Sequence, residues 1–160
     1  MSDERIEVTR RIAAPARAIF AVVSDPEGHV EIDGSGMLEA APDARRITAA
    51  GQTFAMDMDR EPLGDVPLGK YQVTNRVTRF VPDRLVEWTV GLTGNPGLGH
   101  VYGWQLEPVQ DDETDVTNYC DWSGLPDEAR ERTAGRWPIV PVEMLERSVE
   151  NLDRIVTTRA

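Results

Sequence analysis

The stretch PVEMLERSVENLDRIVTTR, residues 141–159, decides the fold expected for this chain. Its apolar residues recur every three or four positions, which is the spacing of one stripe along an α-helix. The stripe consists of Val142, Leu145, Val149, Leu152 and Val156. A helix of this kind is stable only when its stripe is buried. Two heptads of this spacing also fit a short coiled coil, although such seams usually run over three or four heptads.

The chain before this helix alternates apolar and polar residues with the period of two that is typical of β-strands. The predicted strands are residues 6–12, 37–41, 51–59, 69–80, 85–91, 100–107 and 114–122. Val77 and Phe80 are three positions apart within one of them, which indicates a β-bulge. Two short helices are predicted after the first strand, one from Pro15 to Asp25 and one over residues 27–32.

These elements predict one α+β domain over residues 1–160. It consists of a curved antiparallel sheet of about six or seven strands, two short helices after the first strand, and a long C-terminal helix across the sheet. Residues 60–69 and 93–97 are predicted loops, and residues 125–137 are an irregular segment or a lid. Whether side chains fill the space between helix and sheet is the functional question.

The amino-acid composition of the chain limits which kinds of partner the protein can bind and where we expect it to reside. The formal net charge of −11 argues against nucleic acid, whose phosphates would be repelled. No apolar run approaches 18 residues, so we expect no stable membrane insertion. The lone Cys120 excludes a disulfide within the chain and fits a reducing cytoplasm, where we expect the protein to reside. The sequence leaves a homodimer open.

Several fragments, in their order and spacing, resemble the SRPBCC (START/Bet v 1-like, helix-grip) superfamily, and within it the bacterial polyketide cyclase/dehydrase and lipid-transport branch. The fragments are IAAPARAIF (12–20), SDP (24–26), DGSGM (33–37), NRVTRFVPDRLVEW (75–88), WQLEP (104–108), TDVT (114–117) and DWSG (121–124). The resemblance covers nearly the whole chain and implies a helix-grip fold with a cavity between the sheet and the C-terminal helix.

The resemblance favours binding or carriage of a small hydrophobic ligand, such as a lipid, a polyketide or an aromatic metabolite, in that cavity. The alternative is an enzyme of the polyketide cyclase/dehydrase type, whose inward polar groups position a substrate and transfer protons. A third interpretation is an interaction module with a closed core. One fold carries many functions, so the site must decide among them.

Residues on the apolar strand faces and on the helix stripe are the candidate ligand contacts. They are Met56, Met58, Trp88, Tyr102, Trp104, Asn118, Cys120, Trp122, Leu145, Val149 and Leu152. Plain core packing is the alternative for each apolar side chain, and it is the more common role of any single one; for Asn118 the alternative is a hydrogen bond to the backbone. Asn118, Tyr71 and Asn75 are candidates for inward polar groups that would orient a ligand.

For the enzyme interpretation, the catalytic candidates are Tyr102, His100, His29 and Asn118. His29 and Asp33 are one helical turn apart, which suggests either an oriented base at a pocket mouth or a solvated pair on a helix surface. Cys120 lacks a nearby histidine in sequence and is more simply a buried thiol. No spacing of ligands indicates a metal, and no motif indicates a cofactor.

Overall fold

A computed structural model describes residues 3–42, 44–64, 67–94 and 97–159. The elements in chain order are β1 (Arg5–Ile12), α1 (Ala16–Val23), α2 (Pro26–Ile32), β2 (Leu38–Ala40), β3 (Thr53–Asp59), the 3₁₀ turn η1 (Glu61–Leu63), β4 (Lys70–Val81), β5 (Leu85–Leu92), β6 (Val101–Gln110), β7 (Glu113–Asp121), α3 (Asp127–Arg132) and α4 (Val142–Thr158). The predicted loops at 60–69 and 93–97 lie partly outside the described residues, because residues 65–66 and 95–96 are not among them.

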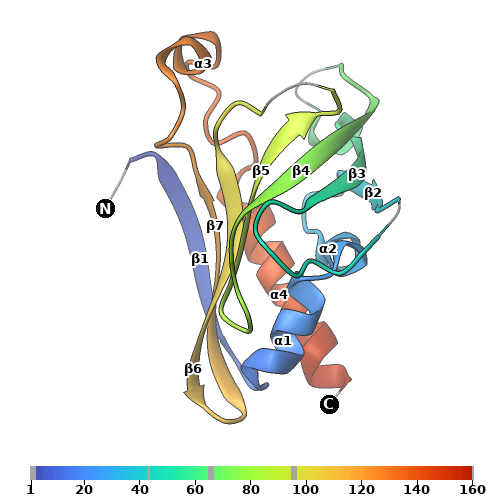
Figure 1. Ribbon diagram of the computed structural model, residues 1–160, viewed down its shortest axis with the longest axis vertical. Coiled ribbons are helices and arrows are strands. Elements are labelled where there is room, and N and C mark those ends of the chain that lie inside the picture. The colour runs from blue at the N-terminus through green and yellow to red at the C-terminus, as the bar shows by residue number, and fades with distance from the viewer. Residues whose placement is uncertain (1–2, 43, 65–66, 95–96, 160) are drawn as a thin grey trace.

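In the described part of the chain, seven strands form one antiparallel sheet in the order β1-β7-β6-β5-β4-β3-β2. The first strand therefore pairs with the last one, and each remaining strand pairs with its neighbour in sequence (Figure 1). The predicted bulge is confirmed, because Val77 pairs with Trp88 whereas Arg79 pairs with Glu87. The extra residue resets the alternation, so that Val77 and Phe80 both pack into the core.

The long helix α4 covers the sheet as predicted, with α1 and α2 on the same face (Figure 1). Pro141 precedes its first turn, and its stripe residues Leu145, Val149, Leu152 and Val156 are buried. The coiled-coil interpretation is wrong, because this stripe is buried within the chain itself. The α+β helix-grip architecture expected from the sequence is confirmed.

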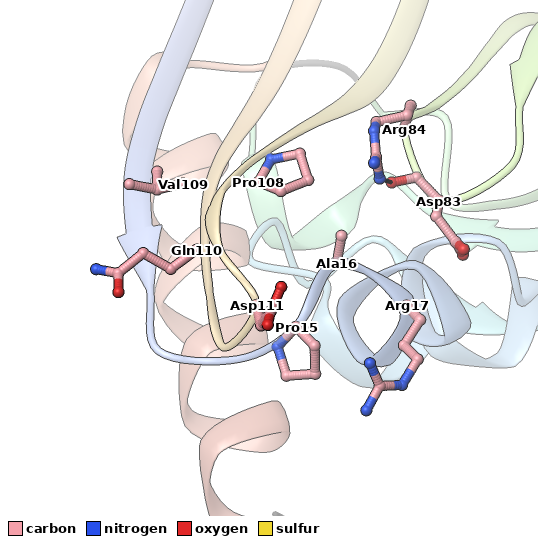
Figure 2. Close-up of a pocket in the computed structure, with 9 residues that line it drawn as sticks. All are labelled: Pro15, Ala16, Arg17, Asp83, Arg84, Pro108, Val109, Gln110 and Asp111. Atoms are coloured by element: carbon pink, nitrogen blue, oxygen red, sulfur yellow. Dashed lines mark hydrogen bonds between the residues drawn. The ribbon is translucent and has the colours of Figure 1, made fainter.

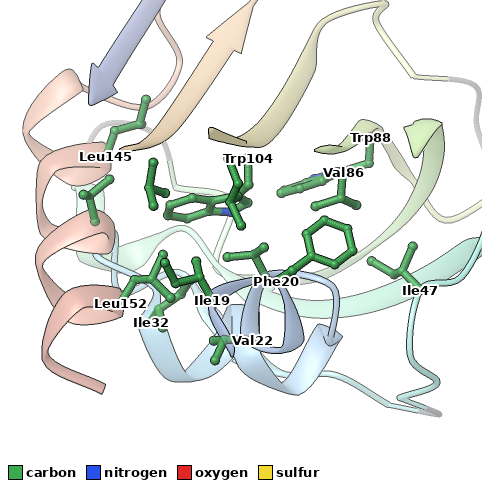
Figure 3. Close-up of a cluster of buried hydrophobic side chains, with 14 of the residues drawn as sticks. Ile19, Phe20, Val22, Ile32, Ile47, Val86, Trp88, Trp104, Leu145 and Leu152 are labelled. Atoms are coloured by element: carbon green, nitrogen blue, oxygen red, sulfur yellow. The ribbon is translucent and has the colours of Figure 1, made fainter. Parts of the chain in front are cut away.

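One end of the space between helix and sheet is filled by α1. This helix contacts β6, α2 and α4, and its Ile19 lies in the same apolar cluster as Ile32 of α2 and Leu152 of α4 (Figure 3). Val86 of β5 and Val116 of β7 complete this cluster from the sheet side with no exposed surface. Burial of such side chains contributes roughly 1.5–3 kcal/mol each and supplies most of the driving force for folding.

Arg10 is a charged residue on the otherwise apolar face of β1, and it lies at the rim of this packed end. Arg10 donates from Nε to Oδ2 of Asp153 on α4 at 2.6 Å. The ion pair ties the first strand to the last helix where both reach solvent.

None of the described helices is long and apolar enough to cross a membrane.

Candidate functional site

A cavity of about 1160 Å³ lies under the other end of the sheet. Its roof is the inner face of β3 to β7, and its floor is the first half of α4 together with the segments around residues 33–38 and 138–141. Seven of the candidate ligand contacts line it, namely Met56, Met58, Trp88, Tyr102, Trp104, Asn118 and Leu145. The two histidines and the inward polar candidates Tyr71 and Asn75 line it as well.

Four candidate contacts do not line this cavity. Cys120 and Trp122 lie in a second apolar cluster with Leu125 and Ala129, because α3 and the turn before it cover that end of β7. Val149 and Leu152 lie in the main core, since they are one and two turns beyond Leu145 on α4, where α1 occupies the space.

A series of aromatic rings forms one wall of the cavity and continues beneath α3. His29 stacks on Trp88 at 4.7 Å, and Trp88 stacks on Tyr102 at 6.5 Å between ring centroids. Tyr102 meets the edge of His100 at 5.5 Å, and His100 meets Trp137 at 4.7 Å. The series links α2, the sheet and the segment that follows α3, so the wall is built from three parts of the chain that are distant in sequence.

His29 is buried in this wall, with 5% of its surface exposed. Its Nε2 bonds to the carbonyl oxygen of Val23 at 2.7 Å, and burial lowers the pKa of the imidazole. The solvated-pair interpretation is therefore wrong. Asp33 instead accepts hydrogen bonds from Ser35 and from the backbone N–H of Leu38, so no bond joins His29 to it.

His100 and Asn75 each carry a buried polar atom that has no hydrogen-bond partner among the described residues. The atoms are Nδ1 of His100 and Oδ1 of Asn75, and both residues are 5% exposed. Burial lowers the pKa of His100 to about 4, so the imidazole is neutral at pH 7. By contrast, Asn118 donates from Nδ2 to the carbonyl oxygen of Gly103 at 3.0 Å and is held by the sheet.

Tyr102 and Cys120 face each other across β6 and β7. Burial raises the pKa of Tyr102 well above its ordinary value of 10. It also raises the pKa of the Cys120 thiol to about 12. Both groups keep their protons at neutral pH, so Tyr102 can donate a hydrogen bond but cannot act as a base, and Cys120 cannot act as a thiolate nucleophile.

Arg60 is a cavity residue that the sequence analysis missed. It lies 8% exposed, with Nη1 at 3.5 Å from Met37 Sδ and Nη2 donating to the carbonyl oxygen of Ile139 at 3.2 Å. The sequence does contain a pattern that predicts an inward position for Arg60. This residue continues the every-second-residue series of Phe54, Met56 and Met58 one step beyond the end of β3.

The segment after α2 is held against α4 by an unusually close approach. A Cβ on Gly34 would lie 2.4 Å from the carbonyl oxygen of Met144, so only glycine fits there. The backbone N–H of Gly34 donates to Ser148 Oγ at 2.9 Å, and Asn151 donates to the carbonyl oxygen of Ile32 at 3.1 Å. This contact fixes the edge of the cavity and gives a structural role to the run DGSGM.

A second, smaller hollow of about 410 Å³ lies on the outside of the molecule. It forms where the start of α1 meets the β4–β5 and β6–β7 turns (Figure 2), with Arg17, Asp83, Arg84 and Asp111 among its lining residues.

The described residues include no group of three His, Cys, Asp or Glu side chains placed to hold a metal ion.

Comparison with known proteins identifies the class to which this fold and cavity belong. Residues 3–157 match the family described as "Polyketide cyclase / dehydrase and lipid transport", and the chain belongs to that family. The uncharacterized protein Rv0088 of Mycobacterium tuberculosis is 35% identical over 118 residues, which cover 74% of this chain and 47% of the relative. The chain thus spans about half the length of the curated relatives that it matches.

Solved structures share the fold at low sequence identity. Protein Ms6760 from Mycobacterium smegmatis has a TM-score of 0.66 at 17% identity, covering 98% of this chain and 93% of the other. The Zhui aromatase/cyclase from Streptomyces sp. R1128 has a TM-score of 0.61 at 16% identity, covering 97% and 94%. A point mutant of norcoclaurine synthase from Thalictrum flavum, solved with a transition-state analogue, has a TM-score of 0.62 at 16% identity, covering 97% and 94%.

Proposed function

We propose that this protein binds a small hydrophobic molecule in the cavity between the sheet and α4. The observation that carries the proposal is the cavity of about 1160 Å³ beneath a sheet whose tryptophans line the space without filling it. Small-molecule sites in proteins are typically concave, mostly apolar spaces of about 300–1,000 Å³ with a few polar groups. Burial of apolar ligand surface would drive binding.

A cavity-filling substitution tests this proposal. Val73 of β4 lines the cavity, whereas Thr74 is the next residue and faces the other side of the sheet. We expect the parent and Thr74→Trp to bind the neutral fluorescent probe N-phenyl-1-naphthylamine with similar affinity. Val73→Trp should weaken binding at least tenfold, because the indole would occupy the ligand space.

Equal probe binding by all three proteins would contradict the proposed cavity site, and absence of binding by the parent would contradict hydrophobic-ligand binding itself. Far-ultraviolet circular dichroism and urea unfolding verify that Val73→Trp is folded, and Val73→Phe provides a smaller insertion if it is not. Native mass spectrometry of the purified protein, before and after removal of lipids, would then identify any ligand that copurifies.

The second candidate function is catalysis of the cyclase/dehydrase type. The observation that favours it is the side-by-side placement of Tyr102 and His100 in the cavity wall, with ring centroids 5.5 Å apart. Such an enzyme would position a poly-β-keto substrate and move protons between carbon and oxygen. A protonated Tyr102 beside a neutral His100 could donate and accept hydrogen bonds there.

Turnover assays test this second candidate. Tyr102→Phe and His100→Phe should each depress turnover of a poly-β-keto substrate, Tyr102→Phe by removing only the hydroxyl group. A parent protein that binds the substrate without converting it would favour carriage over catalysis.

A further inference from the structure

Two polar side chains in the cavity wall are buried at a cost that the fold itself does not require. Asn75 Oδ1 and His100 Nδ1 have no hydrogen-bond partner among the described residues. A buried polar group without a partner destabilises the fold, so an apolar residue of similar size would stabilise it better at either position. By contrast, the buried side chains of Asn118 and His29 in this wall are each bonded to a backbone carbonyl oxygen.

The two side chains lie on one row across the sheet. Asn75 of β4 pairs with Val90 of β5. Thr89 pairs with Val101, the first residue of β6, which places His100 beside Val90 just before that strand. Adjacent strands are about 4.8 Å apart, so Asn75 and His100 are roughly 10 Å apart on either side of Val90. Both residues line the cavity, and so does Val90.

Each side chain can offer either a hydrogen-bond donor or an acceptor to the cavity. Rotation about the last side-chain torsion exchanges the oxygen and nitrogen of the Asn75 amide, and a change of tautomer exchanges the donor and acceptor nitrogens of the His100 imidazole. Because His100 is neutral at pH 7, it can donate or accept a hydrogen bond. A hydroxyl group, which does both, fits either partner in either orientation.

We infer that Asn75 and His100 form a two-point polar anchor, which selects an apolar ligand carrying two separate hydroxyl or carbonyl groups over a pure hydrocarbon of the same shape. This inference rests on the proposed cavity site and specifies the chemistry of its ligand. Binding would supply the two hydrogen bonds that the protein leaves unmade, while the aromatic wall contacts the apolar body of the ligand.

Three probes of one shape test the anchor, namely naphthalene, 2-naphthol and 2,6-dihydroxynaphthalene. Their affinities are measured by displacement of N-phenyl-1-naphthylamine. We expect the parent to bind the diol most tightly. In Asn75→Leu and His100→Phe, the affinity ratio of diol to naphthalene should fall about threefold to tenfold, the range expected for one hydrogen bond. Asn75→Leu should also raise resistance to urea, because the unpartnered amide is gone.

Thr74→Val is the matched control, because Thr74 is next to Asn75 on β4 but faces the other side of the sheet, so this variant should leave the ratio unchanged. A ratio equal to that of the parent in both polar variants would overturn the anchor while leaving the cavity site intact. Failure of all three probes and of N-phenyl-1-naphthylamine to bind the parent would overturn the cavity site, and the anchor with it. Asn75→Val and His100→Leu give the same comparison if either first variant fails to fold.

Discussion

The inner face of the sheet is packed at one end and open at the other, although α4 covers both. At the packed end, α1 fits between helix and sheet, and Ile19, Leu152 and Val116 have no exposed surface. At the open end, the first half of α4 faces the cavity, and the segments around residues 33–38 and 138–141 close its edges. The same strands and the same helix therefore build a solid core and a hollow.

Polar side chains differ between the two ends in the same way. Buried Thr114 donates to the carbonyl oxygen of Ala14 at 2.9 Å, and buried Ser24 donates to that of Phe20 at 2.6 Å. At the open end, polar atoms of Asn75 and His100 stay unpartnered. The packed end is thus organised for stability, whereas the open end keeps bonding capacity that the fold does not use.

The largest expected effect is a difference in lost stability between alanine variants of two leucines on α4, Leu152 and Leu145. Leu152→Ala should destabilise the fold by about 3–5 kcal/mol, because it leaves a void in a packed core. Leu145→Ala should cost only about 2 kcal/mol, since the space it opens joins an existing cavity, and it should alter probe affinity. Urea unfolding of both variants measures this contrast, and equal losses would contradict the distinction between the two ends.

The next largest effect is a loss of folding stability at acidic pH, and it arises from His100 at the open end. The folded pKa of His100, about 4, lies below the ordinary value of 6.5. The unfolded chain therefore takes up a proton first as the pH falls, and stability is lost from about pH 6.5 down to pH 4, by about 3 kcal/mol in total. His100→Phe should remove this part of the acid sensitivity.

Urea unfolding at pH 7 and at pH 4.5 tests the titration of His100. The difference between parent and His100→Phe isolates this residue, because His29 and the carboxylates are present in both proteins. An identical loss of stability in both proteins would show that His100 titrates normally.

A smaller effect is expected where the edge of the cavity meets α4. Gly34→Ala should destabilise the protein by about 1–3 kcal/mol, because the added methyl group would meet the carbonyl oxygen of Met144. It should also change probe affinity by moving the edge of the cavity. Gly124→Ala is the control, since its methyl group would meet only the Gly99 carbonyl oxygen at 3.5 Å; a similar loss in both variants would contradict this account.

The smallest effect is expected from the exposed ion pair at the packed end. Arg10→Ala, Asp153→Ala and the double variant should give a coupling free energy below about 1 kcal/mol, because Arg10 is 48% exposed at its side chain and water screens the charges. The coupling should fall further in 1 M salt. A coupling well above this value, unaffected by salt, would mean that charge, and not apolar burial, holds α4 at this end.

Periodicity was sufficient to predict the sheet, the long helix and much of the cavity wall. The alternation groups Met56, Met58, Trp88, Tyr102 and Trp104 on apolar strand faces, because alternation along a strand is a local property of the backbone. In the structure, these five residues line the cavity. The same alternation would have included Arg60 had the strand face been followed one residue further.

Periodicity could not predict which residues of the inner face pack in the core and which line the cavity. Val149 and Leu152 have the same helical spacing as Leu145, and Cys120 and Trp122 continue the face of Asn118. These four residues lie in packed clusters because α1 and α3 cover them. Which side chains an element covers depends on contacts between parts of the chain that are distant in sequence.

The order of amino acids is enough to predict the strands, the long helix and the α+β class, because apolar period and turn residues act locally. The family resemblance adds the helix-grip arrangement. Contacts between distant parts of the chain set where the space under α4 is filled and where it is left open. They also bury His29 against Trp88 and bring Asn75 and His100 onto one row. These features cannot be predicted locally, because burial and hydrogen-bond pairing are properties of the whole packed chain.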